Sequence, residues 1–131
     1  EFTDADNQIM AAAGRLLEIC RDAFSRQEFS KALEAIWTVL GDTNAYFAEQ
    51  APWVLRKTDI ARMETVLYVT LEVLRRVGLL VQAVMPNASA ALLGVLGQTE
   101  GTVREFESFD IRLAPGQHLP TPTPIFPKYE N

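Results

Sequence analysis

The placement of seven prolines constrains this chain more than any other feature of its sequence. Proline ends a helix that runs into it and is excluded from central strands. Pro52 and Pro86 each interrupt a long amphipathic pattern of helical period, and the other five prolines fall within residues 115–131. We therefore predict an all-α fold, in which residues 1–109 form an antiparallel helical bundle and residues 110–131 form an extended Pro-rich tail.

Apolar residues at spacings of three and four predict helices at residues 4–25, 28–50, 60–85 and 86–97, with a short turn of helix at 52–57. Thr3 and Asp6 have the spacing of a capping box, and Asp59 is a good N-cap. The faces expected to form the core are Ile9, Ala13, Leu16, Leu17, Cys20 and Phe24 in the first helix, and Phe29, Leu33, Ile36, Trp37, Leu40, Asn44 and Phe47 in the second.

Residues that usually carry catalysis or hold metals are sparse in this sequence. His118 is the only histidine and Cys20 the only cysteine, so a histidine-based triad and a metal site with several His and Cys ligands are excluded. The carboxylates of Asp4 and Asp6 are interpreted as solvent charges in a first helical turn. Residues 66–85 are apolar but include three charged side chains, which would be costly in lipid. We therefore expect no catalytic site, no metal and no membrane span.

The charge of the chain is negative overall but uneven. A net charge of −5 and a pI near 4.8 argue against a general nucleic-acid binder. Residues 51–85, however, hold five basic and three acidic side chains, and Trp53 precedes Arg56 and Lys57 directly after a helix-breaking proline. Two interpretations follow for Trp53. Its ring either packs into the corner between two helices, or forms an exposed platform where a stacked base gains roughly 1–3 kcal/mol beside phosphate-binding cations.

Three stretches match the motifs of one known domain family. NAYFAEQAPWVLRKTD is similar to a helix ending in Asn-x-Tyr-x-x-Glu-x-x-Pro-Trp before a short basic turn. LYVTLEVLRRVGLLVQAVMP is similar to the next long helix, which ends at a proline. FDIRLAPGQHLPTPTPIFPKYE is similar to a closing segment in which Leu-x-Pro-Gly precedes a proline-rich run. Together they cover most of residues 27–131, and the chain resembles the anticodon-binding domain of methionyl-tRNA synthetases.

The resemblance implies a helical bundle of the class Ia synthetase type whose first helix precedes residue 1. In that family the domain reads the CAU anticodon of methionine tRNAs, and the tryptophan matching Trp53 stacks on the first anticodon base, a cytosine. Asn44 and Tyr46 are possible neighbours of that base. Charge, rather than a motif, adds three candidate tRNA contacts: Arg56, Lys57 and Arg62. The alternative for these cations is a solvated position at a helix end.

The resemblance also implies a parent enzyme, an ATP-dependent methionine–tRNA ligase of class I that acts in protein synthesis. Its separate catalytic domain uses ATP with magnesium and methionine, whereas this chain itself is expected to bind no cofactor. The expected partners are methionine tRNA and that catalytic domain, on which the tail of residues 110–131 packs back. We further expect a cytoplasmic monomer. An acidic residue often precedes the Glu-Gln of the motif, but Ala48 stands there in this chain, so no acid at that position rejects wrong anticodons.

Two alternatives remain open from the sequence. The chain could be the equivalent domain of another class I aminoacyl-tRNA synthetase, although the closing segment argues against this. It could also be a helical protein-interaction module, in which the surface around Trp53 binds a partner protein.

Overall fold

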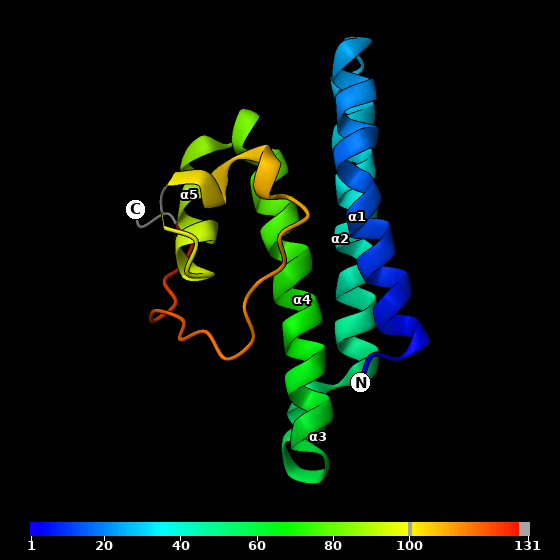
Figure 1. The fold of residues 1–131 in the computed structure, drawn as a ribbon, viewed down its shortest axis with the longest axis vertical. Helices are drawn as coiled ribbons and strands as arrows, with labels where there is room; N and C mark the ends of the chain where they lie inside the picture. The colour runs from blue at the N-terminus through cyan, green and yellow to red at the C-terminus, as the bar shows by residue number, and fades with distance from the viewer. Residues whose placement is uncertain (100, 129–131) are drawn as a thin grey trace. The chain divides into compact units, whose positions relative to one another are not determined.

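The structure is a computed structural model that describes residues 1–99 and 101–128. Its elements are α1 (Asp4–Ser25), α2 (Phe29–Gln50), α3 (Pro52–Thr58), α4 (Ile60–Leu80) and α5 (Pro86–Val95), with three 3₁₀ helices at Val81–Ala83, Gly101–Arg104 and Phe106–Ser108 (Figure 1). No strand occurs among the described residues, so the predicted all-α class is confirmed. Contacts divide the chain into two compact units, unit 1 (Glu1–Leu74) and unit 2 (Arg75–Asn131).

Unit 1 is built on a hairpin of two long helices. Figure 1 shows α1 and α2 side by side and running in opposite directions. The turn between them places Gln27 at a φ of 59°. Both helices contribute buried residues to this unit: Asp6, Ile9, Met10, Ala13, Leu16, Cys20 and Ala23 from α1, and Ala32, Ile36, Val39, Thr43 and Tyr46 from α2. Most of the core predicted for the first helix is therefore confirmed, including the buried Cys20 thiol, whose pKa is raised by burial.

The core predicted for the second helix is wrong at Phe29 and Trp37, which are 54% and 50% exposed, and at Asn44, which is exposed as well. Ile36 is buried as predicted, but the other buried residues of α2 each lie one position before a predicted one: Ala32, Val39, Thr43 and Tyr46. The apolar pattern of α2 is wider than the face that α1 covers.

The predicted helix starts are confirmed by their hydrogen bonds. The Thr3 amide donates to Asp6 Oδ2 at 2.9 Å and the Asp6 amide donates to Thr3 Oγ1 at 3.4 Å, which completes the capping box. The Arg62 amide donates to Asp59 Oδ1 at 3.0 Å, as expected of an N-cap for α4. The interpretation of Asp6 as a solvent charge is wrong, however, because this side chain is fully buried.

Unit 2 contains the C-terminal part of α4 and the segments after it. The α-helical part of α4 ends at Leu80, earlier than predicted, and its last turn tightens into the 3₁₀ helix before Pro86. The helix α5 ends as predicted near Gly97, where the amide of Gln98 donates to Leu93 O at 2.8 Å and that of Gly97 donates to Gly94 O at 3.0 Å. These two bonds form a Schellman motif, and Gly97 has the positive φ of 76° that the motif requires.

Two of the three charged residues in the apolar pattern of α4, Arg75 and Arg76, have structural roles in unit 2. The guanidinium of Arg75 donates to the carbonyl oxygens of Ser108 at 3.1 Å and Phe109 at 2.7 Å. The guanidinium of Arg76 lies 5.1 Å from the centroid of the buried Phe109 ring, within cation–π distance. These contacts fix the chain where it leaves the last 3₁₀ helix. No described helix is both long and apolar enough to cross a membrane.

Residues 110–128 contain no helix or strand. Leu113 is buried, and the Gln117 side chain reaches the carbonyl oxygen of Gly97 at 3.4 Å. The predicted boundary between residues 109 and 110 and the packing of the tail on an enzyme body both stay predictions. The last residues of the predicted tail, 129–131, lie outside the described residues.

Candidate nucleic-acid interface

The candidate interface is the α3 corner, which we define as residues 51–59. Pro52 disfavours a right-handed helical conformation for the residue before it. Ala51 accordingly adopts a left-handed conformation, with φ 44° and ψ 63°, and is at once the C-cap of α2 and the N-cap of α3. The chain therefore turns at a single residue. Pro52 occupies the first turn of α3, where a backbone N–H would have no partner within the helix, so its absence costs no hydrogen bond.

This turn presents Trp53 to solvent. Its side chain is 58% exposed, and its ring contacts Phe47 of α2 with a centroid separation of 6.0 Å and an interplanar angle of 59°. Tilted aromatic pairs at this distance contribute about 0.5–1.5 kcal/mol beyond the area they bury. Phe47 therefore supports the indole at one position while more than half of the side chain stays open to a ligand.

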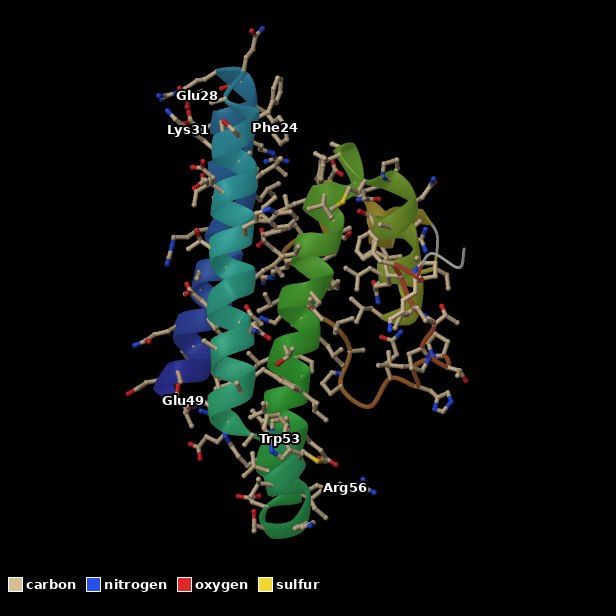
Figure 2. All side chains as sticks on the ribbon, turned by 180° about the vertical axis from the view of Figure 1, so that it is seen from behind. Phe24, Glu28, Lys31, Glu49, Trp53 and Arg56 are labelled. Atoms are coloured by element: carbon tan, nitrogen blue, oxygen red, sulfur yellow. The ribbon has the colours of Figure 1, made fainter. Side chains whose placement is uncertain are left out.

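Two cations follow Trp53 by three and four residues, a spacing that puts side chains on the same face of a helix. Arg56 and Lys57 occupy the last turn of α3 and are exposed. Cations are favoured there because the helix dipole is negative at the C-terminus. Figure 2 shows Trp53 and Arg56 projecting from the α3 corner, with Glu49 projecting on the other side of α2. An exposed aromatic ring and two exposed cations thus lie on one short helix.

Two other predicted contacts, Tyr46 and Arg62, lie in a buried cluster around Asp6. The Asp6 carboxylate receives the Tyr46 hydroxyl at 2.5 Å and two guanidinium nitrogens of Arg62 at 2.5 and 2.9 Å. Tyr46 is only 7% exposed, and the Arg62 side chain is 16% exposed. The geometry gives these two residues a structural role in unit 1 and does not place either on the exposed surface of the α3 corner.

The electrostatics of the cluster favour its ionised state. Burial disfavours the charge of Asp6, but hydrogen bonds from Arg62, Tyr46 and a backbone amide outweigh it and hold the pKa of this carboxyl well below its usual range. Burial, together with the bond to Asp6, raises the pKa of the Tyr46 hydroxyl. Hydrogen bonds to Asp6 raise the pKa of Arg62. Asp6 and Arg62 therefore stay charged and Tyr46 stays neutral near pH 7.

Asn44 is exposed on α2. It precedes Phe47 by three residues, a spacing that puts both on one face of a helix. The structure thus brings the predicted residues Trp53, Arg56 and Lys57 together at the α3 corner, with Asn44 on the face that supports the indole. Phe47 was predicted only as core, and nothing in the sequence identified Asp6 as a partner of Arg62.

The α3 corner offers an aromatic ring and cations, and Asn44 of α2 offers an amide; these are groups that bind rather than react. Among the described residues, no three His, Cys, Asp or Glu side chains are grouped to hold a metal ion. A cleft of about 530 Å³ lies elsewhere, in unit 2, between Arg75, Gln98, Glu105, Arg112 and Gln117 among others. None of the six predicted tRNA contacts lines that cleft.

Comparison with known proteins gives consistent matches. Residues 1–131 match the family described as the anticodon binding domain of methionyl tRNA ligase. The chain is 49% identical over 134 residues to the methionine–tRNA ligase of Mycobacterium leprae, and 46% identical over 128 residues to that of Brucella melitensis. These matches cover 99% and 98% of the chain but only 25% of each relative, so the chain spans about a quarter of their length.

Solved structures of one bacterial enzyme match the fold. The crystal structure of the apo form of Mycobacterium tuberculosis methionyl-tRNA synthetase is similar with a TM-score of 0.94 at 47% identity, covering 100% of this chain and 27% of that one. The structure of that enzyme bound by methionyl-adenylate is similar with a TM-score of 0.93 at 49% identity, covering 97% of this chain and 26% of that one.

Proposed function

This chain belongs to the family of anticodon-binding domains of methionyl-tRNA ligases, and from that premise we propose that its α3 corner binds the CAU anticodon loop of methionine tRNA. The observation that carries the proposal is the 58% exposure of Trp53, next to two exposed cations. Single-stranded RNA loops are recognised by stacking splayed bases on aromatic side chains, and cations beside such rings hold the phosphates.

The residues at and around the α3 corner have separate parts in this proposal. Trp53 stacks on the first anticodon base, a cytosine, and Phe47 orients its ring. Arg56 and Lys57 neutralise neighbouring phosphates. Because stacking barely distinguishes one base from another, selectivity requires hydrogen bonds to the base edge, and the Asn44 amide is the candidate donor and acceptor within this chain. The buried Tyr46 and Arg62 contact no RNA in this proposal and support the structure of unit 1 through Asp6.

The chain spans about a quarter of its relatives, and the rest of the proposed enzyme corresponds to the remaining three-quarters. Methionine activation with ATP and magnesium belongs to that part. The tail of residues 110–131 packs back on it. The enzyme is a cytoplasmic monomer that charges methionine tRNA during protein synthesis. Identities of 46–49% to methionine–tRNA ligases favour this function over that of another class I synthetase.

Replacement of Trp53 in the full-length ligase tests the proposal. Loss of a stacking contact worth about 1–3 kcal/mol raises the KM for tRNA about 5- to 150-fold in Trp53→Ala, and by a smaller factor in Trp53→Phe, which keeps an aromatic face. Methionine-dependent ATP–pyrophosphate exchange, which needs no tRNA, is expected to stay near the wild-type rate.

The chain supplies a matched control for this experiment. Trp37 is 50% exposed on α2, close to the exposure of Trp53, but lies outside the α3 corner. Trp37→Ala is expected to leave the KM for tRNA unchanged. Normal tRNA charging by Trp53→Ala, or equal losses from the two tryptophans, would show that the indole of Trp53 is not the stacking platform.

A further inference from the structure

The α3 corner has few contacts of its own to fix its orientation. Of the residues in α3, only Pro52 is buried. Val54 is 51% exposed, and Ile60, just past the corner, is 60% exposed. The turn at Ala51 is strained as well, because a positive φ is costly for a residue with a side chain. The direction of the Trp53 ring therefore depends on contacts outside α3, namely its contact with Phe47 and whatever holds the two ends of the corner together.

Arg62 joins the two ends of the corner. Its Nη2 atom donates to Gln50 Oε1 at 2.7 Å. Gln50 is the last residue of α2 and Arg62 lies in the first turn of α4, so this bond connects the residue before the corner to a residue just after it. The Arg62 amide also donates to Asp59 Oδ1 at 3.0 Å, which fixes the start of α4.

Asp6 in turn fixes Arg62 from α1. Its carboxylate is fully buried and receives both guanidinium nitrogens of Arg62 in a bidentate arrangement, which fixes orientation as well as distance. The remaining lone pairs accept the Tyr46 hydroxyl and the Thr3 amide. Each carboxylate oxygen thus has two donors, and the guanidinium cannot turn away without leaving buried groups unbonded.

We infer that Asp6 and Arg62 are positioning residues for tRNA recognition: the pair, through the Arg62–Gln50 bond, closes the base of the α3 corner and holds Trp53 in its stacking orientation. Arg62 thus acts through Trp53 and not as a phosphate contact. This inference rests on the proposed function and adds residues to its site, one of which, Asp6, lies on a helix that contributes nothing to the exposed surface of the corner.

A double-mutant cycle in the full-length ligase tests the inference, with the KM for tRNA as the readout. Gln50→Ala is the milder variant, because it removes one acceptor and leaves the Asp6–Arg62 pair intact. Arg62→Gln removes the whole connection. We expect each to raise the KM for tRNA several-fold, within the factor of about 5–150 that Trp53→Ala produces, while ATP–pyrophosphate exchange is unchanged.

The decisive comparison is the same substitutions in a Trp53→Ala background. If Gln50 and Arg62 act only by placing the indole, each substitution should raise the KM for tRNA less than about twofold once the indole is absent. The effects of residues that act as a unit are not additive. Equal factors in both backgrounds would overturn the inference and assign Arg62 a separate contact or a general folding role. Gln8→Ala, which changes an exposed glutamine of α1, is the matched control and should leave the KM unchanged.

The outcomes also separate this inference from the proposed function. Normal charging by Trp53→Ala would overturn both. A defective Trp53→Ala combined with a normal Gln50→Ala would overturn the positioning role alone. If Arg62→Gln fails to fold, Gln50→Ala and its cycle with Trp53→Ala still decide the question.

Discussion

Replacement of Asp6 by alanine is expected to lower the free energy of unfolding of the chain by about 3–5 kcal/mol, the usual cost of removing one partner of a buried ion pair. The contacts support this magnitude. The Tyr46 hydroxyl, on a residue 7% exposed, loses its acceptor, and a buried polar group without a partner costs about 1–3 kcal/mol. Arg62 loses a bidentate partner, and α1 loses half of its capping box, worth about 1 kcal/mol.

The assay is urea unfolding followed by far-ultraviolet circular dichroism, which reports directly on the helices. Asp22→Ala is the matched control, since it removes the same residue type from the same helix. The pair of Asp22 with Arg26 has a separation of 3.2 Å, but both side chains are more than 60% exposed, so its loss should cost less than about 1 kcal/mol.

A second comparison isolates the hydroxyl. Tyr46→Phe should destabilise the wild-type chain by about 1.5–3 kcal/mol, because its hydrogen bond is to a charged group, but should be nearly neutral in an Asp6→Ala background. The reasoning is refuted if Asp6→Ala costs no more than Asp22→Ala, or if Tyr46→Phe is equally costly in both backgrounds.

The depressed pKa of Asp6 also makes stability depend on pH, because an unfolded aspartate titrates at about 3.9 and the folded carboxyl titrates lower. The stabilisation is present above that value and is lost as the pH falls below it, so the urea midpoint should drop more between about pH 5 and about pH 3 for the wild type than for Asp6→Asn. At the strained turn, Ala51→Gly should raise the unfolding free energy by up to about 1 kcal/mol, whereas Gly97→Ala, at φ 76°, should lower it by about 1–3 kcal/mol; urea unfolding measures both. Arg56→Gln should reduce the slope of log KM for tRNA against log salt by about 0.7–1, whereas Lys31→Gln, at the opposite end of α2, should leave it unchanged (Figure 2); charging over a potassium chloride series checks this.

The helices could be predicted from the sequence because their signals are local. The predicted start and end of the first helix coincide with α1, and the capping roles of Thr3 and Asp59 are both observed. The early end of α4 was missed because the choice between an α-helical and a 3₁₀ last turn depends on bonds such as that from Gln82 to Arg104 O, 22 residues away.

The errors at Trp37 and Asp6 have a common origin. Periodicity identifies the apolar side of a helix but not which part of it a neighbouring helix covers, so Trp37 was wrongly placed in the core. An acid in the first turn of a helix gives the same sequence pattern whether it is buried in a cap or exposed to solvent. Nothing within one turn of Asp6 indicates its partner Arg62, 56 residues away. The exposure of Trp53 was one of two interpretations, because the sequence does not show whether a ring after Pro52 faces in or out.

The shared carboxylate of Asp6 has a consequence for how this sequence can diverge. Tyr46 and Arg62 lie 40 and 56 residues from it along the chain, yet both need its oxygens. A change at any one of the three leaves hydrogen-bonding groups of the others without a partner. The three positions should therefore vary together among natural sequences. In lineages where Asp6 is replaced by an apolar residue, Tyr46 and Arg62 should have been exchanged along with it.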